Sequence, residues 1–195
     1  MKRYFAVYKP FGVLSQFTAP PGKSSLKDIV RVPPDVYPVG RLDEDSEGLL
    51  LLTNDASFQH RLASPQFRQS KEYLVQVEGA ITAWAVEQLR GGVTIRVKGE
   101  SYRTQPCPCR ILEHAPEIPE RIPPIRVRKS IPVSWISITL TEGKNRQVRR
   151  MTAAIGFPTL RLVRYRSGPL TLEGMQPGDL REINAKEAED ILRGG

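Results

Sequence analysis

At 195 residues the chain can form one domain with its own hydrophobic core, or two small lobes that share an interface. Its 39% hydrophobic and 26% charged residues are typical of a globular protein, and its longest apolar run, residues 49–52, is far too short to cross a membrane. The amino terminus lacks a long hydrophobic signal region, and Cys107 and Cys109 lie too close together to staple a fold. We therefore expect a cytoplasmic protein with no membrane partner.

The chain is basic, with 29 lysines and arginines against 21 aspartates and glutamates and a net charge of +8. Such a balance favours polyanionic partners, because each neutralised phosphate releases counterions. The densest basic stretches contain Lys144, Arg146, Arg149 and Arg150, followed by Arg161, Arg164 and Arg166. We interpret these side chains as a phosphate-facing surface. The alternative, an ordinary solvated helix face, stays open at this point.

In the first third of the chain, residues 2–8 predict a strand that ends at the turn sequence Lys9-Pro10-Phe11-Gly12. A short helix is expected near residues 25–30 and a short strand over 37–39. Four leucines followed by Thr53 predict a strand at 49–53 that is buried on both faces. Asn54-Asp55 ends this strand, and residues 57–62 predict a helix.

The rest of the chain predicts more strands than helices. Thr82 is placed to cap a helix that continues to Leu89 and ends at Gly91-Gly92. Residues 116–132 contain five prolines and predict an ordered loop or extended arm. Strands are expected at 72–78, 93–97, 102–112, 135–140 and 160–165, and further helices at 145–155 and 185–192. Because strands and helices do not alternate regularly, we expect an α+β fold with a mixed, mostly antiparallel sheet. We place it in a single domain, 1–195, with two sub-lobes flanked by helices and a central active-site cleft.

The most informative stretch is residues 40–55, where Gly40-Arg41-Leu42-Asp43 ends a strand and Gly48 opens the buried leucine run. A backbone of this kind can hold the carboxylate of Asp43 rigidly at the lip of a cleft. Three interpretations compete: an ordinary acidic turn, a calcium loop and a catalytic carboxylate. Calcium is disfavoured because Asn54 stands where a bidentate glutamate is needed and no helix enters the loop.

This segment resembles the Gly-Arg-Leu-Asp-x-x-Ser/Thr-x-Gly-Leu-Leu signature of RNA pseudouridine synthases, in the branch typified by RsuA. Three further stretches agree with that family in order and spacing. They are Lys71-Glu72-Tyr73-Leu74-Val75, the run from Glu142 to Met151, and Leu162-Val163-Arg164 with the following Gly168-Pro169. The resemblance covers the chain from Tyr4 to Leu180, and it favours the catalytic interpretation of Asp43.

Within the family the chain looks most like the E type of large-subunit rRNA enzyme. Most relatives carry an amino-terminal S4 RNA-binding domain, whereas here the catalytic region is expected to begin almost at Met1, and the arm continues into Arg128–Pro132. This resemblance implies rRNA as the partner, namely 23S rRNA or a large-subunit assembly intermediate. It also implies the pseudouridine synthase catalytic fold, an isomerase activity, no cofactor and no metal. We expect a monomer.

The resemblance also implies the roles of individual residues. Asp43 is the essential carboxylate, and an ionised carboxylate in a closed cleft needs a cation beside it. By position Arg149 is the better match for that cation and Arg146 the alternative, with simple phosphate contact as the competing role of both. Tyr73 would stack on the uracil, and Arg41 would fill the space left by the flipped base or hold a phosphate. Ser46 is expected to hydrogen-bond within the Asp43 loop, and Gly48 to permit a tight turn.

Two other functions remain in competition: a noncatalytic RNA-binding protein on the same fold, and an N-glycosidase that frees uracil. The first does not account for Asp43 occurring together with Tyr73 and Arg149, and the second would need another carboxylate to activate water. Cys107 and Cys109 with His114 or His60 could supply metal ligands, but their spacing fits no common zinc site.

Overall fold

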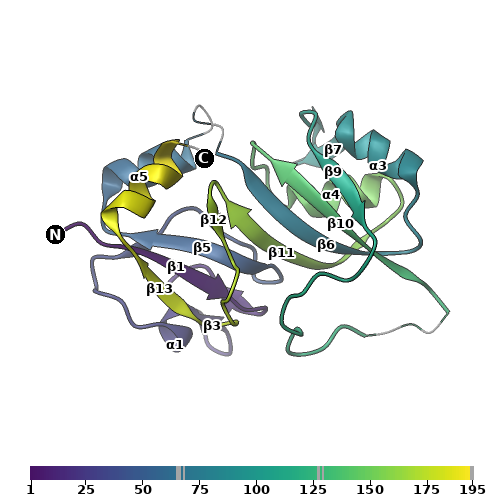
Figure 1. Cartoon of the computed structure of the whole chain (residues 1–195). Helices are drawn as coiled ribbons and strands as arrows, with labels where there is room; N and C mark the ends of the chain where they lie inside the picture. The colour runs from purple at the N-terminus through teal and green to yellow at the C-terminus, as the bar shows by residue number, and fades with distance from the viewer. Residues whose placement is uncertain (65–66, 68, 127, 129, 194–195) are drawn as a thin grey trace. The chain divides into compact units, whose positions relative to one another are not determined.

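A computed structural model describes residues 1–64, 67, 69–126, 128 and 130–193 (Figure 1). The chain divides into two compact units, one formed by Met1–Ser70 with Val163–Gly195 and the other by Lys71–Leu162. Within the described part of the chain, no helix is both long and apolar enough to cross a membrane.

The first unit is built on strands that run mostly antiparallel, in the order β13-β1-β5-β11. The exception is the pair β5 and β11, which is parallel. Short strands β4 and β12 add to β5 and β11, and β2 and β3 form a separate parallel pair. The strands are β1 Tyr4–Lys9, β2 Val13–Leu14, β3 Ser24–Ser25, β4 Tyr37–Pro38, β5 Glu47–Thr53, β11 Thr159–Ser167, β12 Leu170–Thr171 and β13 Leu180–Ile183. The first four residues of β11 belong to the second unit. The helices are α1 Leu26–Ile29, α2 Ala56–Ala63 and α5 Ala185–Arg193.

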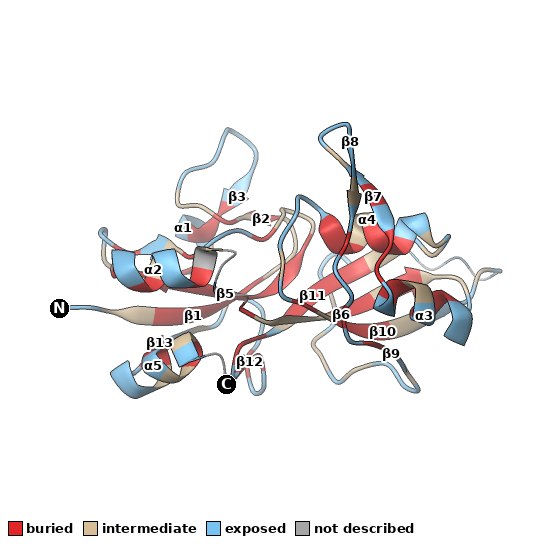
Figure 2. Ribbon diagram, turned by 90° about the horizontal axis from the view of Figure 1, so that it is seen from above, coloured by how far each residue is buried: buried red, intermediate tan, exposed pale blue. Residues whose placement is uncertain are grey.

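All seven residues of β5 are buried, which confirms the prediction from the leucine run. The neighbouring strands β1 and β11 pair with its two edges, while Leu50 and Leu52 are buried by packing in the hydrophobic core of this unit. Figure 2 shows the contrast between these buried strand segments and the exposed outer faces of α2 and α5. Strand β13, which pairs with β1, was not predicted; two of its four residues are exposed and the strand lacks a clear apolar alternation.

The second unit contains a three-stranded antiparallel sheet in the order β6-β10-β9, a β7–β8 hairpin and two helices. The strands are β6 Lys71–Glu78, β7 Thr94–Val97, β8 Glu100–Arg103, β9 Cys109–Leu112 and β10 Val133–Leu140, and the helices are α3 Ala83–Arg90 and α4 Gln147–Ala154. The prediction of a single strand at 102–112 is wrong, because β8 ends at Arg103 and β9 begins at Cys109. Pro106 and Pro108 lie in the gap, and a proline cannot donate a ladder hydrogen bond.

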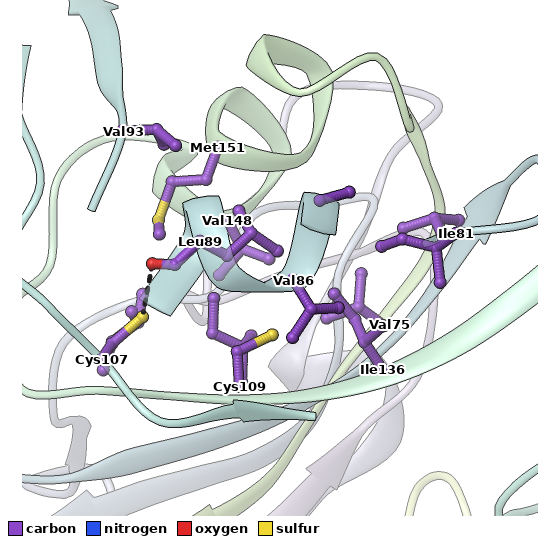
Figure 3. Close-up of a cluster of buried hydrophobic side chains, with 14 of the residues drawn as sticks. Val75, Ile81, Val86, Leu89, Val93, Cys107, Cys109, Ile136, Val148 and Met151 are labelled. Atoms are coloured by element: carbon purple, nitrogen blue, oxygen red, sulfur yellow. Dashed lines mark hydrogen bonds between the residues drawn. The ribbon is translucent and has the colours of Figure 1, made fainter. Parts of the chain in front are cut away.

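Helices α3 and α4 share a hydrophobic core with the sheet of this unit (Figure 3). Val86 and Leu89 of α3 and Val148 and Met151 of α4 are buried there, together with residues of β6 and β10. Both cysteines are buried in the same cluster as free thiols, and Cys107 Sγ donates to the carbonyl oxygen of Leu89 at 3.5 Å. Burial raises the pKa of Cys107 to about 11 and that of Cys109 to about 12, so both stay protonated at neutral pH.

The proline-rich arm has no helix or strand in its described residues, as predicted. It is nevertheless fixed to the second unit at three points. Buried Arg161 donates Nη2 to the carbonyl oxygen of Pro119 at 2.7 Å, and Arg128 forms an ion pair with Glu78 at 3.3 Å. Gly79 N donates to the carbonyl oxygen of Pro132 at 2.8 Å. These contacts attach the described residues of the arm to β11 and to the end of β6.

In the first unit, Asp55 joins the amino-terminal end of α2 to β1. Its carboxylate caps α2 by accepting from the backbone N–H groups of Ser57 and Phe58, and it also accepts from Tyr4 Oη at 2.9 Å. Lys2 Nζ lies 3.0 Å from the same carboxylate. Burial alone would raise the pKa of Asp55, but hydrogen bonds from Ser57, Lys2 and Tyr4 outweigh it and hold the pKa below its usual value.

Asp55→Asn should lower the free energy of unfolding by about 2 kcal/mol at pH 7, because a buried cap and several charge-assisted bonds are weakened. A carboxyl whose pKa is depressed by folding stabilises above the unfolded pKa, about 3.9, and this contribution is lost as the pH falls through the folded pKa. The difference between wild type and variant should therefore shrink below about pH 4. Urea unfolding followed by circular dichroism measures it.

The matched control is Asp190→Asn on α5, where the carboxylate is exposed and lies 3.9 Å from Arg193. We expect a change of at most about 0.5 kcal/mol there. Equal losses in the two variants would contradict the assigned role of Asp55.

Candidate active site

Asp43 lies in the loop between β4 and β5, directly after a residue whose backbone is fixed on both sides. Leu42 is buried in the core of the first unit, and its N–H and C=O both bond to the hydroxyl of Ser15, at 3.0 and 2.7 Å. Ser15 is itself buried. These two hydrogen bonds hold the backbone of Leu42, and the half-buried side chain of Asp43 follows directly from this fixed backbone.

The other side of the loop is held by a turn and by a buried ammonium group. Ser46 N donates to the carbonyl oxygen of Asp43 at 3.0 Å, and Gly12 N donates to that of Glu44 at 2.8 Å. Lys9 is 0% exposed, and its Nζ donates to the carbonyl oxygens of Pro10 and Val13 at 2.9 and 2.7 Å, with Glu44 O at 3.5 Å. Lys9 thus links the turn after β1 to the Asp43 loop.

The charge of Lys9 is costly to bury. Burial lowers the pKa of Lys9 to about 8, although the four carboxylates of the 43–47 segment act in the opposite direction. Above about pH 8 the neutral amine has one donor fewer and no longer attracts these carboxylates. The loop is therefore held most firmly below that pH.

Gly48 brings β5 into close approach with β11. It has a φ of +115°, and a Cβ atom at this position would lie 2.4 Å from the carbonyl oxygen of Arg164 and 2.6 Å from its nitrogen. Arg164 pairs with Gly48 in the parallel ladder, and its Nε donates to the carbonyl oxygen of Leu49 at 2.7 Å. The expected role of Gly48 as the residue that permits this turn into β5 is consistent with both its φ and the contact.

The prediction that Arg161 and Arg164 belong to a phosphate-facing surface is wrong. Both are buried, and their guanidinium groups donate to carbonyl oxygens of Pro119 and Leu49. Arg150 is also used within the fold, since it donates to the carbonyl oxygens of Asn145 and Arg96. Arginine is chosen at such sites because its planar group can satisfy several carbonyl oxygens.

The side chain of Ser46 differs from the expectation as well. Its Oγ is buried and, within the described chain, has no hydrogen-bond partner, so the hydroxyl does not fix the loop. The backbone N–H of the same residue performs that task, as described above. Glu44, in the same loop, forms a partly exposed ion pair with Lys23 at 2.5 Å.

The remaining predicted site residues lie in two groups. Arg41 shares the loop of Asp43; it is exposed, and its Nη2 lies 3.5 Å from Gln16 Oε1. Tyr73, Arg146 and Arg149 belong to the second unit, where Tyr73 of β6 is half-buried and packs against the core shared by α3 and α4. Arg149 lies in the first turn of α4 and is half-buried with a buried Nε atom, whereas Arg146 is exposed.

Helix α4 begins at Gln147, two residues later than predicted, because its N-cap Arg146 has left-handed dihedral angles of φ 51° and ψ 35°. A non-glycine residue in this region costs about 1 kcal/mol or more, and such residues are concentrated at functional sites. Sequence reasoning missed Lys9 and Ser15, since neither a buried lysine nor a serine that bonds across 27 positions has a local signal.

Comparisons with known proteins agree with this architecture. Residues 3–154 match the family model of RNA pseudouridylate synthases. The chain is 50% identical over 176 residues to the ribosomal large subunit pseudouridine synthase E of Vibrio vulnificus (strain CMCP6), covering 90% of this chain and 73% of the relative. It is also 50% identical over 171 residues to the protein of the same name from Xanthomonas axonopodis pv. citri (strain 306), covering 87% of each.

A crystal structure of a pseudouridylate synthase matches the fold with a TM-score of 0.80 and 26% identity, over 98% of this chain and 74% of that protein. The chain therefore belongs to the RNA pseudouridylate synthase family. The family, the fold class and the isomerase activity expected from the four sequence motifs are confirmed.

Gly48→Ala should destabilise the first unit by about 3 kcal/mol or more, since it combines backbone strain with a clash against the backbone of Arg164. Gly40→Ala is the matched control: Gly40 also has a positive φ, 69°, but a Cβ there meets nothing within 4 Å. We expect a cost of about 1–2 kcal/mol from strain alone at Gly40. Thermal unfolding of both variants measures the difference, and equal costs would contradict the close approach of β5 and β11.

Lys9→Met should lower the rate of pseudouridine formation about 10- to 100-fold, because a small displacement of the Asp43 loop is enough to cost that much. The wild-type rate should also fall above about pH 8, where Lys9 loses its proton, and this alkaline limb should be absent from the variant. Lys23→Met is the control, since Lys23 pairs with the same loop from an exposed position. A Lys9→Met enzyme with the wild-type rate would show that the ammonium group does not position the loop.

Proposed function

We propose that this chain is a pseudouridine synthase of the large ribosomal subunit that acts on 23S rRNA, or on an assembly intermediate containing it, in the cytoplasm. The name shared by the two relatives described above supports the large-subunit substrate, at 50% identity over most of both chains. The net charge of +8 is in keeping with a polyanionic substrate. The bacterial cytoplasm is where ribosomal RNA is made and assembled.

Asp43 is the catalytic carboxylate in this proposal. The observation that carries the assignment is the fixed backbone around it, held by Ser15 on one side and by Lys9 on the other. An ordinary acidic turn on a surface needs no such support. A carboxylate that must meet a sugar carbon in one geometry does need it, because misplacement by a fraction of an ångström lowers the rate.

The reaction breaks the bond between uracil N1 and ribose C1′, turns the base, and joins C5 to C1′. The C5 proton is released and N1 gains a proton, so substrate and product are isomers and no oxidant, reductant or group donor is required. Asp43 would add to C1′ or remove the 2′ proton to give a glycal; both routes need one ionised carboxylate. The target base would leave its stack to reach this group.

The other site residues take supporting roles in the proposal. Arg149 is the better candidate than Arg146 for the ion pair with Asp43, because a half-buried guanidinium group with a buried Nε suits a carboxylate removed from water. Exposed Arg146 suits a phosphate. Tyr73 would stack on the uracil while the base turns, and exposed Arg41 would fill the vacated space in the RNA or hold a phosphate.

Asp43→Asn should abolish tritium release from unmodified rRNA that carries tritium at uracil C5, while RNA affinity stays within a few fold of wild type. The amide keeps the size of the side chain but has no negative charge for either route. Tritium release and filter binding measure the two effects. Glu44→Gln in the same loop is the control and should keep the wild-type rate, since its side chain forms a partly exposed ion pair with Lys23.

The product separates this proposal from its competitors. Pseudouridine in the RNA, detected with tritium in water, identifies an isomerase, whereas free uracil would identify a glycosidase. Binding of rRNA with neither product would identify a noncatalytic RNA-binding protein. A wild-type rate in Asp43→Asn would remove Asp43 from the mechanism.

A further inference from the structure

The β7–β8 hairpin of the second unit has two chemically different faces. In the antiparallel register Ile95 is opposite Tyr102 and Val97 opposite Glu100, while Thr94 is opposite Arg103 and Arg96 opposite Ser101. Cross-strand partners share a face. The inner face therefore contains Ile95, Val97 and Tyr102, which pack on the core shared with α4. The outer face contains Thr94, Arg96, Ser101 and Arg103, and all four residues are exposed.

This outer ribbon face, Thr94, Arg96, Ser101 and Arg103, offers only hydroxyl and guanidinium groups, and Arg103 already uses Nη2 to donate to the carbonyl oxygen of Gly91 at 3.2 Å. The single carboxylate of the hairpin, Glu100, belongs by register to the other face. At the tip, Lys98 and Gly99 form a two-residue turn in which both have positive φ values, 53° and 88°. Turns of this type favour Asn and Gly, so backbone geometry gives no reason for lysine at position 98. The exposed ammonium of Lys98 extends the positive charge of the outer ribbon face.

The carboxylate of Glu142, which precedes α4, links the inner side of the hairpin to the first residue of that helix through hydrogen bonds. This carboxylate accepts from the hydroxyl of Tyr102, from Gln105 N at 3.0 Å and from Gln147 Nε2 at 2.5 Å. Gln147 is the first residue of α4, and its Oε1 accepts from Lys144 N at 2.9 Å. Hydrogen bonds to an ionised acceptor are about twice as strong as neutral ones.

A second set of hydrogen bonds connects the hairpin to α4. Arg150 of α4 donates Nη1 to the carbonyl oxygen of Arg96, and its Nε and Nη2 bond to Asn145. Lys144 Nζ lies 4.6 Å from the centroid of the Tyr102 ring. A two-stranded ribbon is marginally stable alone, and these bonds hold it in one position relative to Arg146 and Arg149.

We propose that the outer ribbon face and Lys98 form an RNA-binding surface that holds phosphates of the RNA substrate, with Glu142 as the residue that positions the hairpin. The identity of the RNA rests on the function proposed above. The surface suits a sugar–phosphate backbone because its groups are cations and hydroxyl donors without aromatic rings for base stacking. Arg96 and Lys98 are the residues on which affinity depends most, since both side chains are exposed and, within the described part of the chain, Arg96 contacts α4 through its backbone carbonyl oxygen.

The test compares the double variant Arg96→Gln/Lys98→Asn with a charge-matched control, Lys27→Gln/Lys186→Gln, whose two exposed lysines lie in the first unit. Affinity for an unmodified rRNA transcript is measured by filter binding over a series of salt concentrations. The ribbon variant should bind about tenfold more weakly, and its slope of log affinity against log salt should be less steep by about 1.4–1.8, for two lost phosphate contacts. Its rate at saturating RNA should stay within about twofold of wild type, so the loss falls on KM.

Folding does not confound this comparison. Asn suits the left-handed backbone at position 98, so Lys98→Asn should leave the melting temperature unchanged or raise it slightly. Equal affinity and equal salt slope in the ribbon variant and the charge-matched control would overturn the proposal. If the wild type released no tritium from rRNA but the ribbon variant still lost affinity, the proposed function would fail and this surface would stand. If the wild type and the ribbon variant both released tritium with the same KM and the same salt slope, the proposed function would stand, and the proposal that this surface binds RNA would fail.

The positioning role of Glu142 is tested through Tyr102→Phe, which removes one of its donors and keeps the ring. If the hairpin must be held in place to contact RNA, Arg96→Gln/Lys98→Asn should cost less affinity in the Tyr102→Phe background, about threefold instead of about tenfold. A purely structural role would lower stability without changing this coupling. Additive losses would therefore remove Glu142 and Tyr102 from the proposal.

Discussion

The geometry of the Asp43 loop depends on the burial of one ammonium group. Removing a charge from water costs several kcal/mol even after relaxation, and the lowered pKa of Lys9 reflects this cost. The cost is offset where the ammonium group meets fixed acceptors, here the carbonyl oxygens of Pro10, Val13 and Glu44. These acceptors belong to two separate loops, so the charge is best solvated only when the loops lie in one arrangement. A neutral side chain could fill the same volume without imposing that arrangement.

In the second unit a negatively charged group, the carboxylate of Glu142, also holds an irregular segment in one arrangement. The segment before α4 has no regular structure, and Arg146 takes a strained left-handed conformation there. Glu142 accepts from a side-chain hydroxyl, a backbone N–H and a side-chain amide that come from the hairpin side and from α4. Loops that carry functional residues are seldom rigid by themselves, because they bury little apolar surface. In each unit a charged residue with several partners provides rigidity that packing alone does not.

How far the sequence alone reaches depends on whether the information is local. The buried strand β5 follows from its leucines, and the cap of α3 follows from Thr82, whose side chain accepts from Ala85 N. The short strand β13 and the parallel contact of β5 with β11 do not follow, because they depend on partners more than 100 positions away. The candidate site divides in the same way. Its motif residues could be found by resemblance, but Lys9 and Ser15 act through contacts that no local pattern encodes.

The arginines illustrate why a count of charges in the sequence does not locate an RNA-binding surface. Arg150, Arg161 and Arg164 contribute to the net charge of +8, yet all three donate to backbone carbonyl oxygens within the fold. A guanidinium group satisfied in this way has fewer donors left for a phosphate, and where it is buried it releases few counterions on binding. Sequence clustering therefore overstates the role of residues 161–164, and it gives no indication of Arg96 and Lys98, which lie outside the basic stretches at 144–166. Exposure, and the partners each group already has, decide which cations can meet the RNA.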